Sequence, residues 1–411
     1  MKIRFLALFL LVIFPCAAMA DDIMPDFKDT LTGDWNGERD KWKAEGIELG
    51  ATDYFDAFAA AQGGQRILNN LNINALFDGD KLVNVPGLSG LFSVLQTNGS
   101  QPSRTLTGAV QRIDDMETEH RGLEIYQVWL QQEFFGGGIS MLAGIYDATN
   151  EFYSTDASDI LINNAYGFGT ELAATGTKGG VAIFPTSAAG GRLRLQPTKQ
   201  LYLQAAVMDG INTAPETREH LRINGDSSAL IIGEGGYMKM MDKVETAKIA
   251  FGAWRYTDQI GSLFQQKEAK ERSAYISGGE YALTEGYILR KPGSNRGLMV
   301  FARMGIADRE VDRFNYSFST GLDFKGVLKT RAKSELTFGI ADAHLSPVYR
   351  ESLSAQGIAS KSAETALELT YRDYLRPWIS LQPDLQYIIN PDGLRNQENP
   401  TIFGIRTEIN F

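Results

Sequence analysis

The sequence predicts an all-β fold, a transmembrane antiparallel β-barrel of about 16 strands, and three observations support this class. Segments that alternate apolar and polar residues recur along the chain, and 379–390 (ISLQPDLQYIIN) is the most regular of them. After residue 20 no run of 18 apolar residues occurs, which excludes a spanning helix. The chain also ends on an amphipathic segment, 403–411, whose last residue is Phe411. A soluble sheet that buries one face alternates in the same way. The two ends of the chain therefore provide the evidence that separates a membrane barrel from a soluble sheet.

Residues 1–20 have the layout of a secretory signal peptide. Lys2 and Arg4 precede an apolar run, and the segment ends in the small-residue sequence Ala-Met-Ala. The run is short for a membrane anchor, so we expect cleavage after residue 20 and export from the cytoplasm. The chain's single cysteine, Cys16, lies within this segment, which excludes disulfides and cysteine metal sites from the mature protein.

Residues 21–50 form a separate N-terminal periplasmic segment. The stretch LTGDWNGERDKWKAEGIELG predicts a short helix with Asp34 as its cap and Gly46 as its stop. Trp35 and Trp42, seven residues apart, share one face of that helix. It is too short and too charged to span a membrane, so we expect it to pack at the periplasmic side rather than to bind a ligand.

Residues 51–411 are the predicted barrel domain, and no shift in composition divides them. Hydrocarbon offers no water to unpaired backbone groups, so strands can cross it only as a closed barrel. Division of the mature chain by 16 strands leaves about 24 residues for each strand and its connection, which suits a porin-sized barrel. The alternating segments are 139–147, 193–207, 334–341, 365–372, 379–390 and 403–411.

The connections divide into two kinds. The segments 195–204 (LQPTKQLYLQ) and 375–386 (LRPWISLQPDLQ) place proline at a corner, so we predict short periplasmic turns there. Longer polar stretches are predicted to be extracellular loops, namely 211–227, 257–274, 286–297 and 389–401.

The last strand also predicts the location of the protein. In FGIRTEINF one set of alternate positions is apolar and the other carries Arg406 and Glu408. A final amphipathic strand that ends on an aromatic residue resembles the signal by which the barrel assembly machinery recognises its substrates. We therefore expect a Gram-negative outer-membrane location, with the lipids of that membrane around the barrel.

Charge and histidine content argue against other classes of protein. With 40 basic and 50 acidic residues the chain has no basic field for nucleic acid. His120, His220 and His344 lie far apart without a second ligand nearby, so we expect no metal, no cofactor and no enzyme. The pair His344 and Ser346 comes nearest to a hydrolase dyad, and we interpret both as ordinary surface residues.

Several of these stretches together resemble one protein family. LTGDWNGERDKWKAEGIELG, ILINNAYG (160–167), LQPTKQLYLQ and LQPDLQYIINP (381–391) occur in the order seen in carbohydrate-selective porins of the OprB type. The resemblance covers nearly the whole mature chain. It implies a 16-stranded outer-membrane barrel through which sugars diffuse passively, past charged and aromatic side chains. It leaves a monomer and a trimer equally open.

Alternation predicts which side chains line the pore. On the strand near 125–131, Gln127, Trp129 and Gln131 share one face, and Tyr126, Val128 and Leu130 share the other, which we expect to face lipid. Trp129 is either a sugar contact in the lumen or an aromatic residue of the interfacial girdle. The family commonly has an acidic residue at the position of Gln127, so this chain departs from it there.

Charged residues add further candidates. Arg192 and Arg194 alternate with leucines, as do Glu368 and Arg372, and a lipid-facing charge at mid-bilayer would cost about 2–4 kcal/mol. We therefore place them inside the barrel, where pairing with neighbours is the favoured role for each one singly. The full set of pore-lining candidates is Arg121, Gln127, Trp129, Asp147, Glu151, Arg192, Arg194, Glu368 and Arg372.

Three functions remain open on the sequence. A passive channel for glucose-like monosaccharides or related sugars is the main hypothesis. A general or anion-leaning porin, serving sugar acids or oligosaccharides, is the nearest alternative, because paired arginines favour anionic solutes. A closed barrel with a structural, adhesive or enzymatic role is the third.

Overall fold

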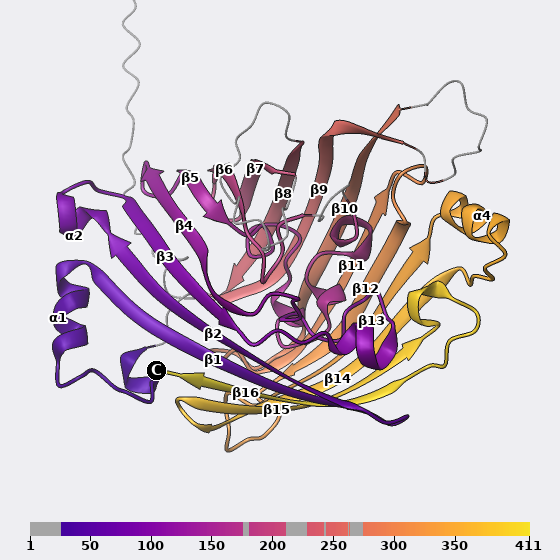
Figure 1. The fold of residues 1–411 in the computed structure, drawn as a ribbon. Helices are drawn as coiled ribbons and strands as arrows, with labels where there is room; N and C mark the ends of the chain where they lie inside the picture. The colour runs from indigo at the N-terminus through magenta and orange to yellow at the C-terminus, as the bar shows by residue number, and fades with distance from the viewer. Residues whose placement is uncertain (1–25, 176–180, 211–227, 242–243, 262, 264–273) are drawn as a thin grey trace, which may run out of the picture.

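Sixteen antiparallel strands close into a barrel in the computed structural model, which describes residues 26–411 except 176–180, 211–227, 242–243, 262 and 264–273 (Figure 1). Each strand pairs with its neighbours in sequence, and the last strand pairs with the first to complete the ring. The predicted barrel of about 16 strands is thus confirmed. The predicted signal peptide lies outside the described residues.

The first strand begins at Ile47, four residues before the predicted start of the barrel domain. The strands are β1 (Ile47–Ala60), β2 (Gln65–Asp78), β3 (Leu88–Thr97), β4 (Gly122–Phe134), β5 (Ile139–Tyr146), β6 (Ala188–Leu195), β7 (Leu201–Asp209), β8 (Ala229–Met241), β9 (Val244–Gly261), β10 (Ala274–Arg290), β11 (Gly297–Ala307), β12 (Phe314–Lys325), β13 (Glu335–Leu345), β14 (Ala363–Arg376), β15 (Ile379–Ile389) and β16 (Thr401–Asn410). Helical segments of the connections include α1 (Glu38–Glu45), α2 (Gly79–Val83), η3 (Asp156–Ser158), α3 (Thr170–Ala173) and α4 (Pro347–Ala355).

Strand direction assigns every connection to one end of the barrel. We call the end where β1 begins and β16 stops the base, and the opposite end the rim. The predicted short turns at Pro197 and Pro377 both lie at the base, as expected, between β6 and β7 and between β14 and β15. The predicted loop at 389–401 lies at the rim.

One predicted outer loop is wrong. Residues 286–290 belong to β10, and the turn that follows them, 291–296, lies at the base rather than the rim. The polar residues misled the prediction because β10, at 17 residues, is longer than the bilayer requires and continues beyond it. The predicted loop 257–274 is strand up to Gly261, and 211–227 and 264–273 lie outside the described residues.

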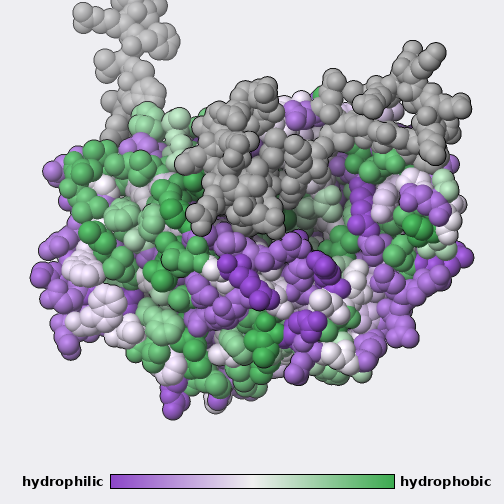
Figure 2. Space-filling view, viewed as in Figure 1, coloured by the Kyte–Doolittle hydropathy of each residue, from purple (hydrophilic) through white to green (hydrophobic). Residues whose placement is uncertain are grey.

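The barrel has its polar side chains inside and its apolar side chains outside. On β15, Gln382, Asp384 and Gln386 point inward and are buried, whereas Leu385 and Tyr387 are exposed on the outer wall. Exposed apolar residues recur on most strands, and Figure 2 shows hydrophobic side chains covering broad areas of the outer wall. A soluble sheet buries its apolar face, so this inversion is the one expected of strands surrounded by lipid. No helix among the described residues is long and apolar enough to span a membrane.

The helix α1 lies at the base beside the C-terminus, as predicted (Figure 1), but it begins later than predicted. Gly37, with φ of 91°, occupies the N-cap, whereas the Asp34 carboxylate accepts a hydrogen bond from the backbone N–H two residues further on, before the helix starts. Trp35 precedes the helix at φ of 53°, although its ring still contacts that of Trp42. Gly46 ends the helix at φ of 101°, as predicted.

Candidate functional site

Two long connections from the rim fold into the barrel and narrow its lumen. We call 98–121, between β3 and β4, the first inner loop, and 147–187, between β5 and β6, the second inner loop. The second inner loop crosses the lumen: η3 contacts β10 to β13 and α3 contacts β11 and β12, on the wall away from β5 and β6 (Figure 1). Any solute must therefore pass the surfaces of these loops.

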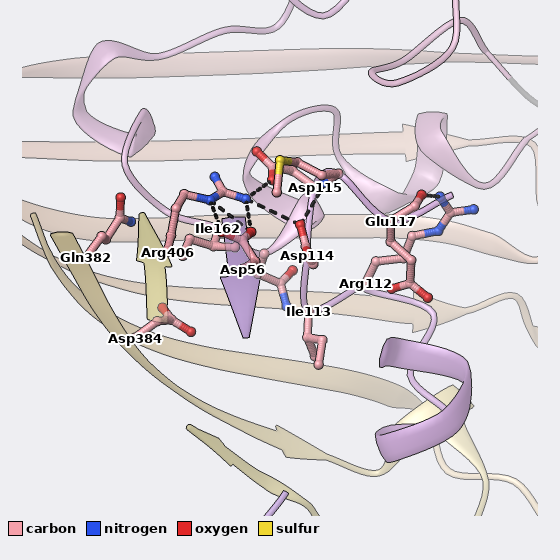
Figure 3. A network of polar contacts seen from close by, with 12 residues as sticks. Asp56, Arg112, Ile113, Asp114, Asp115, Glu117, Ile162, Gln382, Asp384 and Arg406 are labelled. Atoms are coloured by element: carbon pink, nitrogen blue, oxygen red, sulfur yellow. Dashed lines mark hydrogen bonds and ion pairs between the residues drawn. The ribbon is translucent and has the colours of Figure 1, made fainter. Parts of the chain in front are cut away.

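Arg406 fastens the first inner loop to the seam where the barrel closes. Its guanidinium on β16 forms a two-nitrogen contact with Asp56 on β1, at 2.7–3.0 Å, and these two residues are register partners. The same group contacts Asp115 at 2.6 Å and Asp114 at 3.3 Å in the loop (Figure 3). The planar donor fork of arginine suits such multiple carboxylate contacts.

The carboxyl groups of Asp56 and Asp114 are the enclosed members of the cluster around Arg406. Both side chains are fully buried. Burial, together with the nearby Asp56 carboxylate, raises the pKa of Asp114 well above its usual value.

Glutamates on β14 accept hydrogen bonds from backbone N–H groups of both inner loops. Glu368 accepts from the two consecutive N–H groups of 162–163, at 2.5 and 3.0 Å. Glu364 accepts from those of 110–111, at 2.9 and 2.6 Å. A buried donor left without an acceptor is costly, so each glutamate satisfies two loop donors and fixes the loop position.

Glutamine amides on β15 donate hydrogen bonds to carbonyl oxygens of both inner loops. Gln382 donates to the carbonyl of Ile160 at 2.6 Å, and Gln386 donates to that of Ile113 at 2.8 Å. The polar alternation of β15 therefore serves mainly to bind the inner loops.

Glu234 on β8 anchors the second inner loop at the other side of the lumen. It accepts hydrogen bonds from the hydroxyls of Tyr202 at 2.7 Å and Tyr281 at 2.8 Å, and from the backbone N–H of Tyr153 at 2.8 Å. The rings of Tyr153 and Tyr281 stack at 4.0 Å. An extended apolar core between this loop and β5 to β10 surrounds the group.

A cavity of about 480 Å³ opens between the two inner loops. The loops meet beside it through backbone hydrogen bonds, one of them from Asn164 to the carbonyl of Arg112 at 2.9 Å. Its lining has two arginines and two glutamates, with amides and two phenylalanine rings beside them: Arg112, Arg121, Glu117, Glu119, Gln101, Gln111, Phe168 and Phe184. Glu117 is buried, which raises its pKa, while its hydrogen bond from Ser103 opposes the rise.

Arg192 points into the barrel, as predicted, and its charge is fully engaged there. Its guanidinium pairs with Glu151 at 3.0 Å and bonds Gln131 at 2.8 Å and Ser140 at 2.7 Å. Its side chain has no exposed surface. Arg192 therefore fastens the start of the second inner loop to the wall, as the favoured pairing role predicts.

Trp129 lies inside the barrel. Its indole N–H donates to Gln127 at 3.2 Å, and the Gln127 amide donates in turn to Asp147 at 3.3 Å. An amide is needed at residue 127, because a carboxylate could accept from Trp129 but would repel Asp147.

The expectation that Tyr126 faces lipid is wrong. Its hydroxyl donates to Asp147 and its side chain is 3% exposed. A bulge lies opposite Ser93 and Val94, which pair with Gln127 and Ile125 and leave Tyr126 as the extra residue. A β-bulge shifts the alternation by one position, so Tyr126 turns inward next to Gln127.

The remaining candidates occupy varied positions. Arg194 lies 4.6 Å above the Tyr202 ring and donates to Gln204. Arg372 faces inward and pairs with Glu335 at 3.0 Å near the base. Arg121 lines the cavity, and its guanidinium donates to the carbonyl of Gly99. A role in pore lining stays a prediction for each of these residues.

Sequence reasoning missed the residues that bind the inner loops most directly, namely Arg406, Asp56, Asp114, Asp115, Glu234, Glu364, Gln382 and Gln386. Alternation placed Arg406, Gln382 and Gln386 on the polar face of their strands, so an inward position could have been assigned to them. Their partners lie in loops without periodicity, and no sequence pattern indicates which wall residue a loop meets.

The expectation that His344 and Ser346 are both surface residues is wrong for Ser346, which is buried at the start of α4, although both residues have ordinary contacts. His344 contacts Asp342 at 2.8 Å, and the Ser346 hydroxyl caps α4 and donates to the carbonyl of Arg309. His220 lies outside the described residues.

Comparison with known proteins identifies the family. The family model described as carbohydrate-selective porin, OprB family, matches residues 62–411. Porin B of Pseudomonas aeruginosa is 21% identical over 96% of this chain and 94% of its own length. The high-pH structure of Pseudomonas putida OprB is 17% identical, with a TM-score of 0.84 over 94% of this chain and 99% of that one, and shows the same fold. The chain therefore belongs to the carbohydrate-selective porins of the OprB family, which are channels of the outer membrane.

Proposed function

We propose that this porin passes neutral, glucose-like monosaccharides into the periplasm by passive diffusion. The observation that carries the proposal is the cavity between the inner loops, whose lining has two arginines and two glutamates and combines amides with two aromatic rings. Hydroxyls of a sugar exchange water for such amides at little net cost, and its apolar ring face suits Phe168.

The ion pairs that lumen arginines form with carboxylates support a preference for a neutral solute. The guanidinium groups of Arg192, Arg372 and Arg406 each contact a carboxylate, so their charge is largely neutralised in place. The anion preference that Arg192 and Arg194 suggested is thereby weakened. The cavity's own charges cancel, so a sugar without charge crosses it at the lowest electrostatic cost.

The experiment is single-channel recording from the purified mature protein in a planar bilayer, with glucose, longer glucans and a sugar acid titrated separately. We expect millimolar glucose to reduce the current, and Arg112→Gln to weaken that block. The control Arg376→Gln changes an exposed arginine at the base and leaves the block unchanged. Current that no sugar alters would contradict selectivity, and absence of current would indicate the closed barrel.

A second candidate is an anion-leaning porin for sugar acids. Arg112 and Arg121 favour it, because within the described part of the chain their guanidinium groups bond backbone carbonyls rather than carboxylates. Stronger block by the sugar acid than by glucose, lost in Arg121→Gln, would select this candidate.

A further inference from the structure

Three carboxylates from separate elements converge on the inner wall, beside the second inner loop. Asp156 comes from η3 in that loop, Glu245 from β9 and Glu285 from β10. One oxygen of each lies within 4.8 Å of the others. We call this group the carboxylate cluster.

One member of the cluster is buried with an unused acceptor. Glu285 is 4% exposed, and its Oε2 accepts a hydrogen bond from the backbone N–H of Ala157 at 2.8 Å. Its Oε1 is inaccessible to solvent and has no hydrogen-bond partner among the described residues. A buried charged oxygen without a partner is costly, so a positive ligand at this place would stabilise the protein.

Nearby cations compensate the cluster only in part. Lys248 on β9 and Arg194 on β6 act electrostatically on Glu245. The Lys248 ammonium donates to the carbonyl of Ser154 at 3.0 Å, and the Arg194 guanidinium lies over the Tyr202 ring. Across the described ranges neither forms an ion pair with a cluster carboxylate, so the cluster has no cation in direct contact.

We propose that the carboxylate cluster binds a divalent cation, Ca²⁺, which fixes the second inner loop to the wall. Calcium accepts six to eight oxygen ligands at about 2.3–2.6 Å, so two ligands on opposite sides of the ion lie up to about 5 Å apart. Magnesium, at about 2.1 Å, would draw them to about 4.2 Å. Because the three oxygens lie within 4.8 Å of one another, they can share one ion of either kind. Calcium is favoured because it accepts flexible, irregular coordination by carboxylates from separate elements, whereas magnesium demands near-ideal octahedral geometry. Water would complete the ligand set.

Calorimetric titration of CaCl₂ into the full mature protein tests the proposal. The protein is refolded in detergent, which removes lipopolysaccharide as a competing calcium ligand, and is treated with EDTA beforehand. We expect one calcium per chain, and Glu285→Gln to weaken the affinity by about tenfold or more, as the loss of a direct ligand does. Glu280→Gln, the same change at an exposed residue of β10 outside the cluster, keeps the native affinity.

A second variant guards against misfolding of the first. Glu245→Gln removes a less buried ligand, and its folding is checked by the heat-dependent shift in gel mobility. EDTA should lower the melting temperature of the native protein and of Glu280→Gln, and leave that of Glu245→Gln unchanged. Native protein that binds no calcium, or variants that bind it equally well, would overturn the proposal, and neither result depends on which sugar the channel passes.

Discussion

Arg406 shows how single residues join the wall of this barrel to the loops inside it. Its charge meets Asp56 across the seam between the last and first strands, and Asp114 and Asp115 in the first inner loop. Buried charges of this kind persist only when paired, because desolvation of a lone charge costs several kcal/mol. One side chain thus links the seam at which the barrel closes to the first inner loop.

Replacement of Arg406 by glutamine should be strongly destabilising. It leaves three clustered carboxyl groups without their cation, and removal of one partner from a buried pair costs about 3–5 kcal/mol. Urea unfolding in detergent measures the loss of free energy. Arg66→Gln, a control at a side chain whose hydrogen bond within the described residues goes to the adjacent carbonyl, should change stability by less than about 0.5 kcal/mol.

A double variant tests the cause of that loss. If unpaired charge is responsible, Arg406→Gln combined with Asp114→Asn should recover part of the stability, since one carboxyl group is removed. A double variant less stable than Arg406→Gln alone would assign the loss to packing instead.

Elements differ in how they are held. The strands form a continuous ladder, so each is fixed by two neighbours, whereas α1 rests on the base through a few contacts. Arg39 is the main one: its guanidinium donates to the carbonyls of Leu49 and Phe411 and ties the helix to the first and last strands. Gly46 sets the direction in which the chain leaves the helix and enters β1.

Substitution of Gly46 by alanine should loosen α1 without opening the barrel. A Cβ there would lie 2.9 Å from the Lys81 side chain and 3.0 Å from the Asp78 carbonyl, at φ of 101°, and strain of this kind costs about 1–3 kcal/mol. We expect faster proteolysis of the N-terminal segment, with an unchanged heat-dependent gel shift.

Gly37→Ala is the matched control for this experiment. Gly37 also has a left-handed φ, of 91°, but its Cβ would meet nothing within 4 Å. Its proteolysis should rise less than that of Gly46→Ala, and equal rates would mean that backbone strain alone, and not crowding, accounts for the effect.

The molecule as a whole is organised by the two solvents that its wall separates. Apolar side chains such as Leu123, Val128 and Leu130 on β4 are exposed on the outside. Polar side chains inside bond the inner loops, as Glu368 and Gln382 do, or one another between neighbouring strands, as Arg372 and Glu335 do. Stability on the outer face therefore depends on depth in the bilayer, whereas stability on the inner face depends on particular partners.

Arginine scanning on β4 tests the depth dependence. Val128→Arg, at the middle of the strand, should cost about 2–4 kcal/mol, because the charge enters the hydrocarbon. Leu123→Arg, near the rim, should cost about 0–1 kcal/mol. Unfolding in lipid vesicles measures both, and equal costs would contradict a lipid-facing position for Val128.

The sequence alone predicted the barrel class, the approximate strand number and the short turns at Pro197 and Pro377. These follow from alternation and turn chemistry, which are local and repeat along the chain. It also predicted that Arg192, Arg194, Glu368 and Arg372 point inward, since a charge in lipid is costly wherever it occurs.

Three features became known only from the tertiary structure. They are the bulge that turns Tyr126 inward, the end of the barrel at which the turn 291–296 lies, and the path of the inner loops. A bulge depends on the partner strand, and the end at which a turn lies depends on counting every strand before it. The contacts of Arg406, Glu234 and the carboxylate cluster join segments far apart in the chain, and no periodic signal records such distant pairs. The strands of the wall could therefore be predicted from the sequence, whereas the loop contacts that define the channel are set only by the tertiary fold.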